Sequence, residues 1–130
     1  MWLAAQSGRT QIVRKLLEVR TDPDYGEKKL GRTPLWEASW SNHTEMMRGL
    51  LEARAKIDVA TTSGPAPGRN ALMVGAQRGH PDAVQLLIQA GASKELKDRD
   101  GRDARDCARE GLARRPQAQR DYADILRLLE

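Results

Sequence analysis

The sequence predicts an all-α protein, an α-solenoid of stacked helix-turn-helix repeats with β-turn or hairpin fingers between them. Similar segments recur at spacings of 37 and 33 residues, beginning at Gly31-Arg32-Thr33, Gly68-Arg69-Asn70 and Gly101-Arg102-Asp103. Helix-capping residues and then an apolar stripe at helical spacing follow at least the first two of these starts. A short unit that recurs at a fixed period buries its apolar face only against its neighbours, which is typical of repeat architectures.

The first helix of each unit is expected to begin at residues whose side chains accept hydrogen bonds from the free amides of a helix start. That column consists of Thr33, Asn70 and Asp103. Pro34 suits the first helical position, because no amide hydrogen is needed there. The helix should end near Gly8, Asn42 or Gly79, since these residue types enter the left-handed conformation most cheaply.

A second helix should follow at once. Pro81 and Asp82 suit its first turn, one having no donor to satisfy and the other being favoured by the helix dipole. Apolar pairs then recur along one face. They are Ile12-Val13 with Leu16-Leu17, Met46-Met47 with Leu50-Leu51, and Ala83-Val84 with Leu87-Ile88. Helices this short are marginal alone in water, so stacking between repeats must stabilise them.

Residues 1–130 are expected to form one domain of four repeats. Residues 1–30 are a truncated first repeat, 31–67 a second with a long finger loop, 68–100 a third and 101–130 a divergent fourth. Small pairs at Ala4-Ala5, Ala38-Ser39 and Gly75-Ala76 would let neighbouring first helices approach closely. In the fourth repeat, extra residues at 111–119 are expected to lengthen the turn between its helices.

The composition is that of a soluble globular protein, with 39% apolar and 31% charged residues and no Phe. No apolar run is long enough for a membrane helix, and no secretion signal opens the chain. The single cysteine, Cys107, agrees with a reducing compartment. We therefore expect an intracellular protein, cytoplasmic or nuclear. The net charge of +4 is weak evidence for acidic partners and does not by itself indicate nucleic acid.

Residues that could do chemistry are few. His43 and His80 occupy one repeat column, where a structural place at the start of the second helix explains both better than catalysis. Cys107 is expected to be a small buried hydrophobe. Zinc-ligand spacing and a phosphate-binding glycine loop are both missing from the sequence. We predict no catalytic residue, no metal, no cofactor and no enzyme activity.

A unit of 33 residues with Gly-x-Thr-Pro-Leu, a small pair, Gly-His, a Leu-Leu run and Gly-Ala resembles the ankyrin repeat. Residues 31–38 and 68–80 carry the motif most clearly, and Ala90-Gly91-Ala92 closes the third unit. The resemblance covers nearly the whole chain. It implies a non-catalytic scaffold or adaptor module that binds another protein through its finger tips and concave helix face.

Two departures from the family pattern are expected to matter. Trp36 stands where histidine usually follows Pro-Leu, which exchanges a hydrogen-bonding side chain for apolar bulk. Arg20 and Arg54 stand where Gly91 supplies the usual helix-ending glycine, and a left-handed non-glycine residue costs on the order of 1 kcal/mol. The first two repeats should therefore be less stable.

The resemblance also implies where a partner would touch the chain. The predicted contact residues are Arg32, Trp40, Ser41, Arg69, Gln77, Arg78, Arg102 and Arg109. Arg32, Arg69 and Arg102 form either a partner-binding ladder, with one arginine per layer about 10 Å apart, or a solvated face. Trp40 is either an exposed anchor for a partner or a residue packed over the neighbouring repeat.

The leading hypothesis is recognition of another protein through an acidic or mixed segment. The alternatives are nucleic-acid binding through the basic finger ladder, which the nearby aspartates and the shortage of aromatics disfavour, and a targeting segment of a larger enzyme. No membrane association is expected. The chain should be a monomer or a weak homodimer through its uncapped N-terminal layer, with Trp2 and Leu3.

Overall fold

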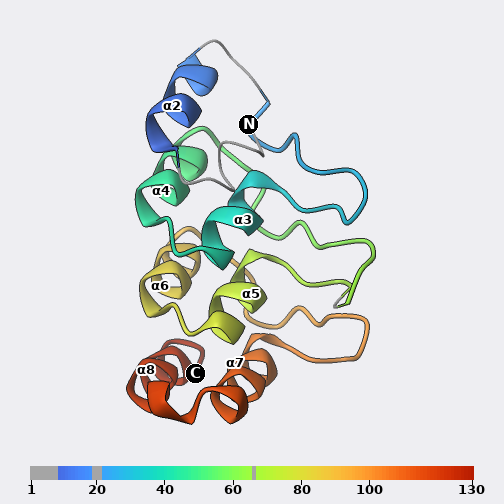
Figure 1. Ribbon diagram of the computed structural model, residues 1–130, viewed down its shortest axis with the longest axis vertical. Helices are drawn as coiled ribbons and strands as arrows, with labels where there is room; N and C mark the ends of the chain where they lie inside the picture. Colours follow the sequence, from blue (N-terminus) through green and yellow to red (C-terminus); the bar gives the residue numbers. More distant parts are fainter. Residues whose placement is uncertain (1–8, 19–21, 66) are drawn as a thin grey trace.

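The computed structural model describes residues 9–18, 22–65 and 67–130, without the side chains of residues 16 and 17. The helices are α2 (Thr10–Glu18), α3 (Pro34–Trp40), α4 (Thr44–Glu52), α5 (Ala71–Arg78), α6 (Pro81–Gln89), α7 (Ala104–Arg114) and α8 (Gln119–Leu128), with a 3-10 turn η1 (Pro116–Ala118) before α8. Helices α3, α5 and α7 form one row, and α2, α4, α6 and α8 form a second row beside it (Figure 1). The predicted all-α repeat stack is confirmed.

The predicted capping column begins three of the helices. Thr33 accepts a hydrogen bond from the Trp36 amide at 3.1 Å, and Asn70 accepts one from the Met73 amide at 3.0 Å. Asp103 accepts one from the Asp106 amide at 2.9 Å, and the Asp106 carboxylate returns the bond to the Asp103 amide. Each cap therefore satisfies amides that the helix start leaves without a partner.

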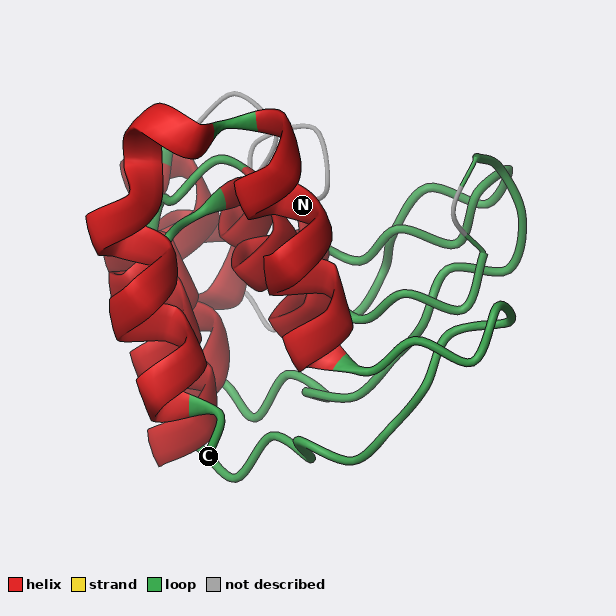
Figure 2. Ribbon diagram, turned by 90° about the horizontal axis from the view of Figure 1, so that it is seen from below, coloured by secondary structure: helices red, strands yellow, loops and turns green. Residues whose placement is uncertain are grey.

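Finger loops join the layers and project to one side of the helices (Figure 2). Gly31, Gly68 and Gly101 have φ angles of 76°, 83° and 77°, a region that favours glycine. In each finger, the carbonyl after this glycine accepts a backbone hydrogen bond from across the loop. The pairs are Glu27 to Arg32 at 2.8 Å, Thr61 to Arg69 at 3.0 Å and Asp98 to Arg102 at 2.9 Å. The repeat spacing in the sequence therefore corresponds to one recurring turn geometry.

The core lies between the two rows of helices. Leu35, Met47, Leu72 and Leu87 are at most 1% exposed. The equivalent positions Leu51 and Ile88 are both partly buried against this core.

The small pairs let α3 and α5 approach closely, as expected. A Cβ on Gly75 would lie 2.7 Å from Ser39 Oγ, and that hydroxyl donates a 2.7 Å hydrogen bond to the Ala71 carbonyl. The absence of a side chain at Gly75 therefore leaves the space that the Ser39 hydroxyl occupies.

The predicted left-handed helix ends are confirmed at Asn42, with φ 58°, and Gly79, with φ 78°. Arg54 also adopts this conformation, with φ 63°, where the next repeat has Gly91 at 96°. The left-handed backbone of Arg54, a residue with a Cβ, costs on the order of 1 kcal/mol. The corresponding predictions for Gly8, Arg20, Ala4-Ala5 and the layer of Trp2 and Leu3 lie outside the described residues.

The prediction that residues 111–119 lengthen the turn is wrong for the first half of this range. Helix α7 continues through Gly111 to Arg114 and has 11 residues, against 7 in α3 and 8 in α5. Gly111 packs so tightly on the Gln77 carbonyl that a Cβ would come within 2.1 Å of it. The Tyr122 hydroxyl, 2.6 Å from the same carbonyl, donates a hydrogen bond to it. These contacts with α5 and α8 stabilise the additional helical turn.

Within the described part of the chain, every helix is too short or too polar to cross a bilayer.

Candidate partner-binding site

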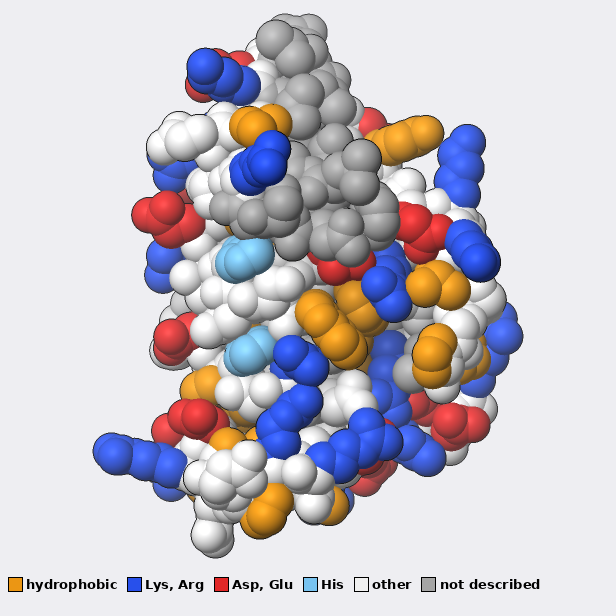
Figure 3. Space-filling view, in the orientation of Figure 1, with side chains coloured by type: hydrophobic (Ala, Val, Ile, Leu, Met, Phe, Trp, Pro, Cys, Tyr) orange, Lys and Arg blue, Asp and Glu red, His pale blue; other side chains and the backbone are white. Residues whose placement is uncertain are grey.

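A groove of about 350 Å³ lies between the fingers and the first helices of repeats two to four. We call it the finger–helix groove. Its helix side carries Trp36, Trp40, Val74, Gln77, Glu110 and Arg114, and its finger side carries Leu30, Arg32, Ser63, Pro65, Asp100 and Arg102. Figure 3 shows hydrophobic side chains bordered by Lys and Arg on this face of the molecule. The groove therefore combines an apolar floor with a basic rim.

One half of the groove is aromatic. Trp36 and Trp40 lie one helical turn apart on α3, so their rings meet and stack with centroids 5.3 Å apart. The guanidinium of Arg32 lies 4.7 Å from the centroid of the Trp36 ring, and that of Arg78 lies 4.4 Å from the centroid of the Trp40 ring. Such cation–π contacts stabilise this arrangement of the two rings and the two arginines.

Trp36 makes a hydrogen bond, although apolar bulk alone was expected where the family has histidine. Its ring is 5% exposed, and Nε1 donates to the Arg69 carbonyl of the next repeat at 3.2 Å. The expectation of apolar bulk alone is therefore wrong, because an indole offers both a large apolar ring and one N–H donor.

The other half of the groove is an ion-pair cluster centred on Glu110. Its carboxylate accepts from Arg102 at 2.7 Å, Arg69 at 3.0 Å, Arg114 at 3.1 Å and Gln77 at 3.3 Å. Burial raises the pKa of Glu110, but the hydrogen bond from Arg69 and the surrounding guanidinium charges outweigh this and lower it below the ordinary value. Glu110 is therefore a stable carboxylate that joins the third and fourth repeats.

The structure does not support an exposed arginine ladder. Arg69 is 3% exposed, and its Nε donates to Asp98 at 3.1 Å. Arg32 pairs with Glu37 at 3.3 Å and has a side chain 30% exposed, whereas the Arg102 side chain is 45% exposed. The prediction that Arg69 is an accessible contact residue is wrong, because Asp98 and Glu110 hold its guanidinium inside the stack.

Asp98 is the buried partner of Arg69. Burial raises the pKa of its carboxyl, yet hydrogen bonds from the Arg102 amide, the Arg69 side chain and the Asp100 amide lower it below the ordinary value. The side chain of Asp98 is 1% exposed. Arg69 and Asp98 therefore form a buried ion pair beneath the groove.

The remaining predicted contact residues divide between the groove and its surroundings. Trp40 is half-buried, and Arg78 covers the Trp40 ring. Trp40 and Gln77 both line the groove. Ser41 caps the end of α3 through its backbone and is not among the groove-lining residues. Arg109 has a side chain 62% exposed and pairs with Asp106 outside the groove. The structure thus brings together Arg32, Trp40, Gln77, Arg78 and Arg102.

Sequence reasoning missed Arg114, whose side chain is 65% exposed and reaches Glu110. The residue was placed in a turn, whereas α7 continues to it. Its spacing of four residues from Glu110 was the available signal, because such pairs face each other on a helix.

The two histidines take the structural position that was predicted for them. His43 and His80 are the N-cap residues of α4 and α6. His80 Nε2 lies 3.1 Å from the Trp40 carbonyl oxygen, and burial lowers the pKa of its ring. Cys107 is fully buried, and burial raises the pKa of its thiol to about 12. Among the described residues, no three or more His, Cys, Asp or Glu side chains gather as possible metal ligands.

Stacked helix pairs with protruding fingers define the class of protein as an α-solenoid of short repeats. Residues 1–63 match the model of ankyrin repeats in three copies, and residues 67–99 match the model of a single ankyrin repeat. A curated relative is the ankyrin repeat and KH domain-containing protein mask of Drosophila melanogaster, 34% identical over 99 residues. That match covers 76% of this chain and 2% of the relative. The chain belongs to the ankyrin repeat family, whose members are generally protein-interaction modules and typically non-catalytic.

Proposed function

We propose that this chain is a non-catalytic interaction module that binds a partner protein in the finger–helix groove. The observation that supports this most directly is the pairing of a half-buried tryptophan, Trp40, with exposed guanidinium groups in one groove. Tryptophan and arginine are the residue types that most often dominate binding energy at protein interfaces. The family's general role in protein interaction points the same way.

The proposed contact residues are a revised form of those that the sequence predicts. Five of the predicted contact residues remain and Arg114 is added, since all six line the groove or cover its aromatic floor. The five are Arg32, Trp40, Gln77, Arg78 and Arg102. Arg69 supports the groove from beneath through Asp98 and Glu110. An intracellular compartment, cytoplasmic or nuclear, belongs to the proposal because Cys107 is a buried free thiol.

Site-specific photo-crosslinking tests this proposal. A photoreactive residue at Ser63, which lines the groove, should capture a protein from a native cell extract. The same residue at the exposed Gln85 of α6 is the matched control and should not capture that protein. Capture from Ser63 should weaken in the variant Arg102→Glu/Arg114→Glu and at higher salt, because exposed charges are screened. Equal capture from both positions would contradict the proposed surface.

Nucleic-acid binding through the basic fingers is the alternative, and the ion pairs of the arginines favour it less. Glu37, Asp98 and Glu110 already neutralise much of the arginine charge. A gel-shift assay with generic DNA and RNA separates the two functions, since tight and salt-sensitive retardation would support the alternative.

A further inference from the structure

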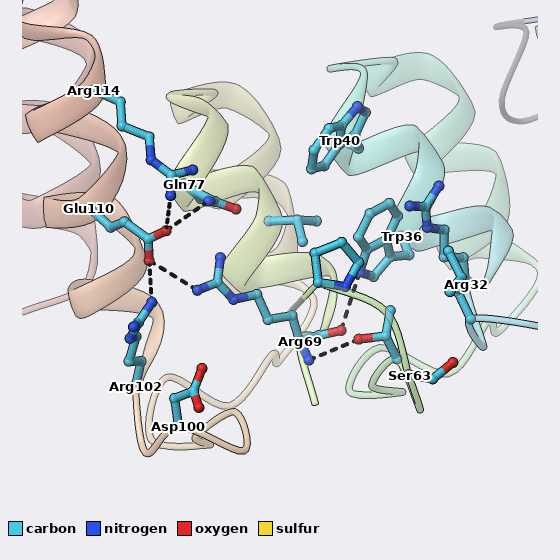
Figure 4. Close-up of a pocket in the computed structure, with 14 residues that line it drawn as sticks. Arg32, Trp36, Trp40, Ser63, Arg69, Gln77, Asp100, Arg102, Glu110 and Arg114 are labelled. Carbon is cyan, nitrogen blue, oxygen red and sulfur yellow. Dashed lines mark hydrogen bonds and ion pairs between the residues drawn. The ribbon is translucent and has the colours of Figure 1, made fainter. Parts of the chain in front are cut away.

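The two halves of the finger–helix groove differ in chemistry. Figure 4 places Trp36 and Trp40 on one side and Arg102, Glu110 and Arg114 on the other, with Arg69 between them. We call these the aromatic half and the charged half. If the groove binds a partner, as proposed above, that partner must present two different groups to it.

The aromatic half can accept one large apolar side chain. Trp40 is half-buried, Leu30 is half-buried and Pro65 is exposed, and all three line the groove. Trp36 beneath them is 5% exposed and held by its hydrogen bond to the next repeat. An aromatic or large aliphatic residue placed here would bury apolar surface on a floor that is already fixed, which lowers the entropic cost of binding.

The charged half can accept carboxylates. The side chains of Arg102 and Arg114 are 45% and 65% exposed. Each guanidinium carries five N–H donors, and Glu110 accepts a bond from one nitrogen of each group. The remaining donors are held in orientation by Glu110 and are free to bind a second carboxylate in the bidentate manner that arginine favours.

Charge in this half selects the sign of the ligand. The buried pair of Arg69 and Asp98 is neutral as a unit, and Arg102 and Arg114 share this half with two carboxylates, Glu110 and Asp100. The side chain of Glu110 is 21% exposed against 45% and 65% for the two arginines, so a ligand meets their guanidinium groups more than that carboxylate. A lysine or arginine from a partner would meet the exposed positive charge of Arg102 and Arg114 at close range. A carboxylate would be attracted to it.

The distance between the two halves sets the length that an extended ligand needs. Trp40 belongs to the second repeat and Arg102 to the fourth, so two layers of about 10 Å separate their backbones. An extended chain advances about 3.3 Å per residue, and side chains cover part of the gap, so about four to six residues suffice.

We propose that the finger–helix groove binds an extended partner segment with an aromatic or large aliphatic residue about four to six positions from one or two acidic residues. The apolar side chain lies against Trp40, and the carboxylates bind Arg102 and Arg114. The two contacts act together, because each fixes the segment for the other.

Synthetic fluorescein-labelled peptides test the proposal directly. Each carries Phe, a Gly-Ser spacer of one to eight residues and then Asp-Glu, and its binding to the full chain is measured by fluorescence polarisation. Affinity should be greatest at about three to five spacer residues. Replacing Asp-Glu by Lys-Lys, or Phe by Ser, should weaken binding by about tenfold or more, which corresponds to about 1.4 kcal/mol.

Protein variants assign the two contacts. Trp40→Ala should weaken the Phe peptide by about tenfold and leave the Ser peptide unaffected. Arg102→Gln/Arg114→Gln should weaken the Asp-Glu peptide and leave a Ser-Ser peptide unaffected. Arg127→Gln, an exposed arginine on α8, is the matched control and should change nothing. A photoreactive phenylalanine in place of the peptide's Phe should crosslink near Trp40 in the unaltered chain, so the test does not depend on the variants folding.

The outcomes separate the inference from the proposed function. Equal binding of acidic and basic peptides, or affinity independent of spacer length, would overturn the inference. So would tighter binding of a DNA or RNA oligomer that depends on Arg102 and Arg114. If the peptides do not bind while Ser63 still captures a protein, the inference fails and the proposed function stands. If Ser63 and Gln85 capture alike, the proposed function fails as well.

Discussion

Arg69 is a charged residue inside the stack, and its ion pairs join segments that lie far apart in the chain. It binds Asp98 at 3.1 Å and Glu110 at 3.0 Å, and its carbonyl accepts from Trp36 at 3.2 Å. The second, third and fourth repeats therefore meet at one residue. Removing one partner of such a buried pair leaves an uncompensated charge, which costs more than the pair itself contributes.

We expect Arg69→Met to lower the free energy of unfolding by about 3–5 kcal/mol, because Asp98 and Glu110 would lose their buried partner. Urea denaturation followed by circular dichroism measures the change. Arg69→Lys keeps the charge and should lose less. Arg109→Met, at an arginine 62% exposed, should change stability by no more than about 0.5 kcal/mol. Equal effects at Arg69 and Arg109 would show that the buried pair contributes nothing.

Acid should destabilise the protein through the same cluster. The pKa values of Asp98 and Glu110 lie below the ordinary 3.8 and 4.5, so the unfolded chain binds more protons than the folded one as pH falls through this range. Their contribution to the free energy of unfolding is therefore complete above about pH 5 and declines below it. Denaturation at a series of pH values should show this decline, and Asp98→Asn/Glu110→Gln should flatten it.

His80 should add a separate decline in the free energy of unfolding, which begins at a higher pH than the decline from Asp98 and Glu110. Burial lowers the pKa of its ring from 6.5, so the unfolded chain gains the proton first as pH falls below that value. Stability should therefore decrease with the same sign between pH 6.5 and the folded pKa. Denaturation of His80→Gln at the same pH values should lack the decline in stability between pH 6.5 and the folded pKa, and should keep the decline below about pH 5. A profile unchanged by the substitution would exclude the assignment.

At the scale of elements, α7 departs most from the other first helices. It extends to Arg114, which lines the groove. The shorter α3 and α5 have no equivalent of this residue. The extension depends on Gly111, since the helix lies directly against the Gln77 carbonyl at the end of α5. Tyr122 and Arg115 also donate to that carbonyl. The end of α5 thus determines the length of α7.

Gly111→Ala should destabilise the protein by about 1–3 kcal/mol, because the new Cβ would meet backbone that cannot move without shifting a helix. Thermal unfolding measures the loss. Gly49→Ala in α4 is the matched control, since a Cβ there meets nothing within 4 Å. Alanine should stabilise α4 by about 0.5–1 kcal/mol through helix propensity. The prediction fails if the two substitutions act in the same direction.

In the whole molecule, each layer is stabilised by its neighbours. Helix α5 lies between α3 and α7 in Figure 1, and six of its residues are buried. Helix α2 lies at one end of the described stack, and Val13 is buried among its described side chains. The strained Arg54 also lies toward that end. A stack whose stability is a sum of neighbour contacts should therefore open from this end.

Amide hydrogen exchange should be slowest in α5 and fastest in α2, with α4 exchanging faster than α6 because of the strained Arg54. Mass spectrometry of peptides from each helix measures this order. Arg54→Gly should slow exchange in α4 and leave α8 unaffected. Uniform protection along the chain would instead indicate that the domain opens as one unit.

The sequence by itself determined the repeat spacing, the capping residues and the left-handed positions of this protein. Each of these depends on a few consecutive residues, as Thr33, Asn42 and Gly68 show. Only the tertiary structure decided that Arg69 is buried, that Glu110 joins three arginines and that α7 continues to Arg114. The burial of Arg69 and the length of α7 depend on residues 29 to 45 positions apart that meet when layers stack, and no local pattern specifies such a meeting.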